Sequence, residues 1–164
     1  MRLSTIAARL SQAGVAVGAV ALTAMIVLIT VQVISRRILT APMVVADELS
    51  GYLLVITTFS ALGYALLHGD HIQVTLVTDR LSDRLRRYLR VAWCLVGLPY
   101  VGLLVWRSAV LVLDSYHSGS FSVTATNVVL WPIQAFVPLG LAVLFVQMLA
   151  ELLEALNLLR RGAA

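Results

Sequence analysis

The sequence predicts an all-α integral membrane protein with four transmembrane helices. Of its 164 residues, 60% are hydrophobic and only 12% are charged. Soluble domains carry about 25% charged residues, so this chain cannot cover a soluble globule with polar surface. Four apolar stretches also approach or exceed the 18 to 20 residues that a membrane-spanning helix needs. Together these observations predict a single membrane domain.

The predicted spans cover residues 13–34, 49–67, 91–113 and 128–150, and no soluble domain remains between them. The first span resembles a signal peptide, because Arg2 and Arg9 precede it and Ala19 to Ala21 resembles a cleavage site. Its apolar run continues well past that site, beyond the 7 to 15 residues of a signal core. We therefore expect an uncleaved first helix.

The arginines predict the orientation in the membrane. All 12 basic residues are Arg. With the N-terminus inside, nine lie on the inner side and three (Arg36, Arg37 and Arg107) on the outer side. The positive-inside rule therefore predicts that both termini are cytoplasmic. Asp47 and Glu48, in the same outer loop as Arg36 and Arg37, are expected to be able to pair with them.

Residues 74–90 form an amphipathic segment between the second and third spans. Apolar residues recur there at steps of three and four, the helical period. We predict a helix on the inner membrane surface that contacts lipid. Its residues include Leu81, Arg84, Leu85, Arg87 and Tyr88. The alternative is a solvated cytoplasmic helix.

Three charges near or inside the spans have two interpretations each. Asp47 and Glu48 open the second span, where acids stabilise a helix N-terminus, and a contact with a partner protein explains them equally well. Arg107 interrupts the third span and is a functional candidate for that reason. The favoured alternative is that Arg107 snorkels to the interface or makes a structural pair, since Trp106 beside it suits an interfacial position.

Several classes of function are disfavoured. No basic run with interleaved aromatics predicts nucleic-acid binding, and the single Cys94 cannot form a disulfide framework or a Cys-based zinc site. His68-Gly69-Asp70-His71 lacks the spacing of a hydrolytic zinc site. The third histidine, His117, falls on the opposite side of the membrane. We therefore predict no metal, no cofactor and no enzyme, and interpret His71 as an architectural residue where the second helix ends.

Two further patterns concern helix packing. Gly14-x-x-x-Gly18 allows close helix approach, although in a chain rich in Gly and Ala chance explains it as well. Pro138 lies inside the fourth span, where neighbouring groups can satisfy a freed carbonyl. Pro132 lies in the first turns of that helix, where proline costs little.

From Arg36 onward the order of motifs resembles one family. An Arg follows the first span, and the acidic pair Asp47-Glu48 opens the second. A small-residue stretch at 60–65, which includes Gly63, precedes Gly69-Asp70-His71-Ile72 and an Arg-rich amphipathic segment. Trp131-Pro132 and residues 137–140 complete the pattern. The chain resembles the small, DctQ-type membrane subunit of tripartite ATP-independent periplasmic (TRAP) transporters.

The resemblance implies a component of a secondary transporter in the bacterial inner membrane. It implies a periplasmic binding protein that delivers a small organic acid, and a large permease subunit that carries the substrate and sodium sites. The small subunit would be a fixed scaffold for that large subunit, with no cofactor of its own. One departure concerns the acidic pair: Val44, Val45 and Ala46 precede it, where the family often has an aromatic residue, and Asp47 replaces what is commonly Glu.

Two other functions compete with this one. A membrane anchor of a redox enzyme would need histidines at matched depths inside two spans, and all three histidines lie outside the predicted spans. A small stand-alone exporter usually needs a carboxylate within a span, and none lies deep in these four stretches.

Overall fold

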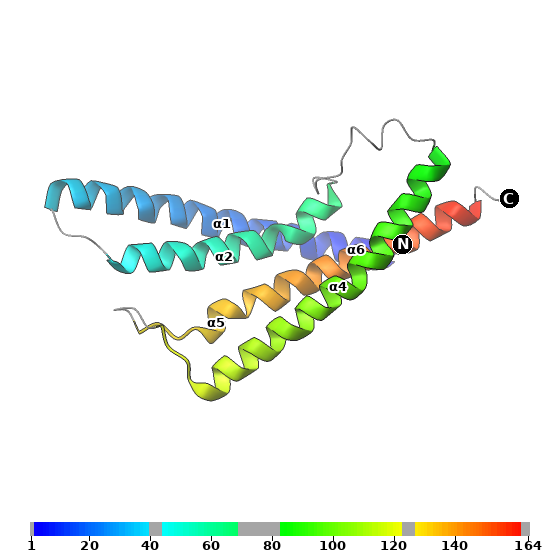
Figure 1. The fold of residues 1–164 in the computed structure, drawn as a ribbon. Helices are drawn as coiled ribbons and strands as arrows, with labels where there is room; N and C mark the ends of the chain where they lie inside the picture. Colours follow the sequence, from blue (N-terminus) through cyan, green and yellow to red (C-terminus); the bar gives the residue numbers. More distant parts are fainter. Residues whose placement is uncertain (1, 40–43, 69–82, 123–126, 162–164) are drawn as a thin grey trace.

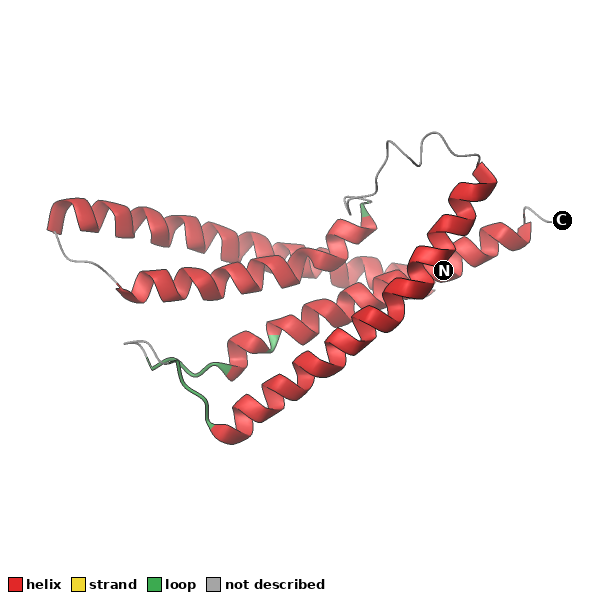
Figure 2. Cartoon of the chain, in the orientation of Figure 1, coloured by secondary structure: helices red, strands yellow, loops and turns green. Residues whose placement is uncertain are grey.

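The computed structural model describes residues 2–39, 44–68, 83–122 and 127–161, and these are almost entirely helical (Figures 1 and 2). The helices are α1 (Arg2–Leu39), α2 (Val44–Leu67), α4 (Asp83–Ser118), α5 (Trp131–Gln134) and α6 (Phe136–Arg161). An isolated bridge joins Phe121 to Val129 in the connection before α5.

In the described residues, four helical stretches are long and apolar enough to cross a membrane, which confirms the predicted fold class. They are Thr5–Ile38, Val45–Leu67, Val91–Ser118 and Trp131–Asn157. All four are longer than the predicted spans, because helical structure continues beyond the apolar runs, most of all in the first. The exact membrane boundaries therefore stay predictions.

The helices form two antiparallel pairs that meet along α6. Helix α1 packs on α2, α4 packs on α6, and α6 also contacts both α2 and α1. Figure 1 shows the two pairs converging near the end where both termini lie and diverging toward the end where α1 ends and α2 begins. Helix α6 therefore holds the two pairs together.

The hydrophobic core is small and lies where α4 and α6 meet α2. Val101, Leu141 and Leu144 are buried there, and the α2 side chains of Phe59 and Leu62 pack against them. Most other large apolar side chains point outward, with Val20, on α1, 71% exposed. An outward apolar surface is expected where lipid or another membrane protein covers the helices.

Glycine allows α1 and α6 to approach the backbone of α2. A Cβ atom at Gly14 would collide with the carbonyl oxygen of Ser60, and one at Gly18 would lie 3.2 Å from that of Thr57. A Cβ atom at Gly140 would collide with the carbonyl of Phe59. Gly14-x-x-x-Gly18 is therefore a packing motif within this chain, between α1 and α2.

Proline interrupts the fourth span near its start. Pro138 has no N–H to donate to the carbonyl of Gln134, and its ring crowds that carbonyl. The helix accordingly breaks at Ala135, between α5 and α6. Pro132 lies in the first turn of α5, where a missing N–H costs little. The helix of this span therefore begins with a short separate turn, Trp131–Gln134.

The predicted amphipathic helix is described only in part. Leu81 lies outside the described residues, which resume at Asp83. Residues 83–90 form the first turns of α4 and continue directly into the third span. Arg84 and Arg87 lie on this segment, where Leu85 and Tyr88 are exposed. A location at the membrane surface stays a prediction for this segment.

Candidate functional site

A polar cluster joins the end of α1 to the beginning of α2. Asp47 lies in the first turn of α2, where its charge suits the positive end of the helix dipole. Gln32, on α1, is only 6% exposed and donates from Nε2 to Oδ1 of Asp47 at 2.7 Å. A buried amide thus binds an exposed carboxylate, and this hydrogen bond fixes the two helix ends relative to each other.

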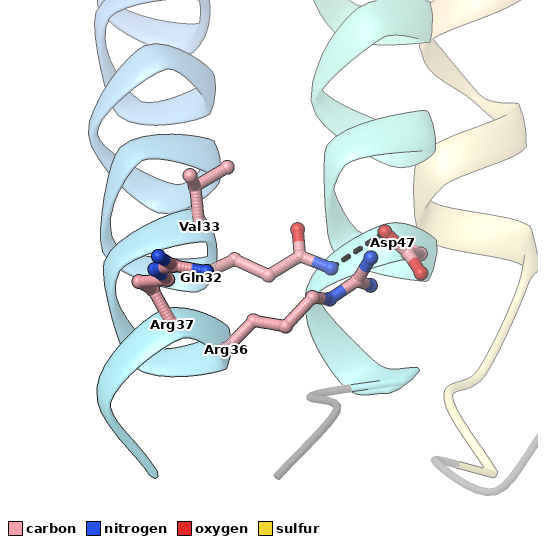
Figure 3. A pocket seen from close by; sticks show the side chains of 5 residues that line it. All are labelled: Gln32, Val33, Arg36, Arg37 and Asp47. Carbon is pink, nitrogen blue, oxygen red and sulfur yellow. Dashed lines mark hydrogen bonds between the residues drawn. The ribbon is translucent and has the colours of Figure 1, made fainter. Parts of the chain in front are cut away.

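The same residues line an open cleft of about 590 Å³. Its lining consists of Gln32, Val33, Arg36, Arg37 and Asp47. Figure 3 shows Arg36 reaching across the cleft toward Asp47. The hydrogen bond that holds Asp47 comes from the amide of Gln32, whereas the sequence suggested that the acids of this loop could pair with Arg36 and Arg37. Both arginines remain exposed, so the cleft presents positive charge beside a single carboxylate.

Glu48 belongs to a second polar contact on the same helix. The hydroxyl of Tyr52, one turn further along α2, donates to Oε1 of Glu48. Tyr52 also makes a hydrogen bond with the side chain of Ser122, in the connection between α4 and α5. The polar groups at this end therefore bridge the two helix pairs, because Ser122 follows the second pair's α4.

Gly63 lies inside the protein, where α1, α2 and α6 meet. A Cβ atom there would be 2.6 Å from Cγ1 of Val143 and 2.8 Å from Oγ of Ser11. Ser11 is completely buried. Gly63 therefore serves packing within this chain, whereas the sequence pattern suggested it as a candidate for contact with a partner.

The remaining candidates lie apart from the cleft. Arg107 is exposed on α4 and does not line it. His68 closes α2, with Nδ1 3.2 Å from the carbonyl oxygen of Tyr64 and its ring 4.0 Å from the Tyr64 ring. His71 lies outside the described residues. Within the described ranges, no three His, Cys, Asp or Glu side chains are grouped as metal ligands would be.

Sequence reasoning missed Gln32, Tyr52 and Ser122. The available signal was spacing: Gln32 precedes Arg36 by four residues and Tyr52 follows Glu48 by four, so each shares a helix face with a charge. Nothing in the local sequence connects Ser122 to Tyr52, since that contact joins distant segments.

Comparison with known proteins supplies the family. Residues 25–158 match the DctQ component of tripartite ATP-independent periplasmic transporters. The chain is also similar to the ectoine TRAP transporter small permease protein TeaB of Halomonas elongata, with 30% identity over 125 residues. That alignment covers 76% of this chain and 64% of the relative, so the chain spans just under two thirds of the relative's length. Matched over most of its length and folded as four apolar helices, the chain belongs to the DctQ family of TRAP transporter components and is a multi-pass membrane protein.

Proposed function

We propose that this chain is the scaffold subunit of a TRAP transporter and that it braces a large permease subunit. The observation that supports the proposal is the apolar outer surface of this chain's helices, in a member of a family of transporter components. In the described spans the acidic side chains lie toward the ends of the apolar stretches, and none lies at the middle of a span, so these spans offer no carboxylate at the bilayer centre for coupling to ions. Solute and sodium sites then belong to the large subunit.

The complex would reside in the bacterial inner membrane with both termini of this chain in the cytoplasm. The arginine distribution supports this orientation. The cleft with Arg36 and Arg37 would then face the periplasm, where a substrate-binding protein delivers the solute. Residues 74–90 would lie against lipid at the inner surface, and His71 would hold the turn before them.

The proposed solute is a small organic acid taken up with sodium. The similarity to TeaB does not carry ectoine over to this chain, because selectivity belongs to the binding protein and the large subunit. The acidic pair Asp47 and Glu48, together with Arg36 and Arg37, is proposed to take part in assembly at the periplasmic end. Reversing both acids to lysine is expected to reduce the yield of the complex and solute uptake together.

The test is reconstitution of the chain with and without its large subunit. We expect affinity-tagged chain to co-purify with the large subunit, and liposomes to accumulate solute only when both subunits and the binding protein are present. Uptake by liposomes that hold this chain alone would refute the scaffold role and support the stand-alone exporter. A haem absorbance band in the purified chain would instead support the redox anchor.

A further inference from the structure

One side of α4 carries polar residues along an outward-facing stripe. Tyr100 is 63% exposed and Leu103 is 58% exposed, and Arg107 and Asp114 are exposed too. Tyr100, Arg107 and Asp114 follow one another at intervals of seven residues, nearly two helical turns, so they share one face. We call Tyr100, Leu103, Arg107, Leu111 and Asp114 the α4 stripe.

The described part of the chain leaves the α4 stripe uncovered. Helix α4 packs mainly on α6 and α5, and it uses Val101, Leu104 and Val105 for the core beside α6. Among the residues that the structure describes, neither the guanidinium of Arg107 nor the hydroxyl of Tyr100 has a hydrogen-bond or ion-pair partner. Both groups are therefore open to partners from outside this part of the chain.

The depth of Arg107 makes lipid a poor environment for it. At 1.5 Å per residue, Arg107 is about 4 Å from the middle of Val91–Ser118 along the helix axis. Measured from the middle of the predicted span 91–113, the distance is about 7.5 Å. Both values lie well within the half-thickness of the hydrocarbon layer, about 15 Å. A charge at this depth usually faces a protein partner or water.

Snorkelling to the nearer interface is disfavoured by helix geometry. That interface lies toward the C-terminal end of α4, near Asp114. The Cα–Cβ bonds of a helix tilt toward its N-terminus, so the side chain of Arg107 leaves the backbone toward the bilayer centre. Tyr100 lies on that side, seven residues before Arg107. The sequence left snorkelling or a structural pair as the favoured interpretation of Arg107, and the outward stripe now argues for a protein partner.

Charge decides which partner fits. In a parallel two-fold dimer of this chain formed through the α4 stripe, Arg107 would face Arg107 of the other copy, and like charges repel in a medium of low dielectric constant. A helix with a carboxylate at matching depth would pair with Arg107, and another acceptor on it would take the Tyr100 hydroxyl. We propose that the α4 stripe docks a membrane helix of the large permease subunit that presents such a carboxylate to Arg107.

This inference rests on the proposed scaffold function, and co-purification of the complex tests it. Arg107→Gln is expected to lower the recovered complex by at least about tenfold, because it leaves the partner's carboxylate buried and unpaired. Arg107→Glu should abolish the complex, and Arg107→Lys should retain part of it. Arg9→Gln, at an exposed arginine near the other end of the bundle, is the matched control and should leave the yield unchanged. Membrane levels of each variant, measured without the large subunit, exclude a loss of folding.

A photocrosslinking amino acid in place of Leu103 locates the partner directly. We expect an adduct with the large subunit, weakened when Arg107→Gln is added. Adducts with lipid alone, or with a second copy of this chain, would overturn the docking proposal. If the yield of the complex were normal in that experiment, the scaffold function would still stand. Unchanged complex yield in Arg107→Gln and Arg107→Glu would overturn it as well. If the unmodified chain failed to co-purify with the large subunit, the scaffold function itself would fail.

Discussion

Gln32, on the largely apolar helix α1, forms a hydrogen bond with Asp47 at the beginning of α2. Its amide is buried, whereas the Asp47 carboxylate that it binds is exposed. The two partners therefore differ in what happens when the other is removed. When Asp47 is removed, the buried donor loses the acceptor that it has among the described residues, but an exposed carboxylate left without its donor is hydrated by water.

This difference leads to a prediction at the scale of single residues. Asp47→Ala should lower the free energy of unfolding by about 1–3 kcal/mol, because it leaves the Gln32 amide buried without an acceptor. Gln32→Leu should cost less than about 1 kcal/mol, since leucine fills the same space and Asp47 stays hydrated. Unfolding of the purified chain in mixed detergent micelles measures both.

The control for this pair is Asp114→Ala, another exposed acid near a helix end, which should change stability little. A larger loss in Gln32→Leu than in Asp47→Ala would contradict the assigned roles of the two side chains.

At the scale of helices, small residues decide how closely the elements approach. Apolar side chains gain little by leaving lipid for a protein interface, so association in a membrane depends on close packing. Gly14 and Gly18 bring α1 against α2, Gly140 brings α6 against α2, and Gly63 lies where all three meet. These close approaches all involve one helix, α2, which packs against both α1 and α6.

A series of Gly→Ala variants tests these close helix approaches. Gly140→Ala and Gly14→Ala should each lower the free energy of unfolding by about 1–3 kcal/mol, because the added methyl meets backbone that cannot turn aside. Gly63→Ala should cost less, since its neighbours are side chains of Val143 and Ser11. Stability of each variant in detergent micelles provides the ranking.

Gly51→Ala is the matched control on α2, because nothing lies within 4 Å of the added methyl. It should raise the free energy of unfolding by about 0.5–1 kcal/mol through better helix propensity. A stabilising Gly140→Ala would contradict the close approach of α6 to α2.

At the scale of the whole molecule, α6 joins two helix pairs that otherwise diverge. Leu141 and Leu144 on α6 are buried against α2 and α4, whereas Leu139 on the same helix is 62% exposed. The union of the pairs depends on a few side chains, and the wide outer surface is left for lipid and partners.

Leu144→Ala should therefore destabilise the chain by about 1–3 kcal/mol, mostly through a lost packing contact and the cavity it leaves. Leu139→Ala should have almost no effect on the isolated chain. Unfolding curves in the same micelles distinguish them, and equal effects of the two substitutions would argue against the α6-centred core.

The orientation of the whole chain is tested by labelling of single cysteines in a Cys94→Ala background. A membrane-impermeant maleimide should label Ser118→Cys in intact spheroplasts, and Leu85→Cys only after the membrane is opened, because the arginine distribution puts Leu85 inside. Labelling of both positions from outside, or the reverse pattern, would contradict cytoplasmic termini.

The sequence by itself determined the membrane class, the number of long apolar helices and the family. Each of these follows from local composition: apolar runs of sufficient length, and motifs in order such as Asp47-Glu48 and Trp131-Pro132. Arg107 was recognisable as unusual for the same reason, since one charge interrupts an apolar run. Local patterns could not say what each residue meets.

Only the tertiary structure decided the partners of these residues. In the structure Asp47 accepts a hydrogen bond from Gln32, and Gly63 and the Gly14-x-x-x-Gly18 motif face other helices of the same chain. Arg107 lies on an outward face. Helical periodicity states which residues share a face, but the direction of that face depends on contacts between segments far apart in the sequence. In a chain whose helices are apolar all round, hydrophobicity does not mark the inner face, and packing alone selects it.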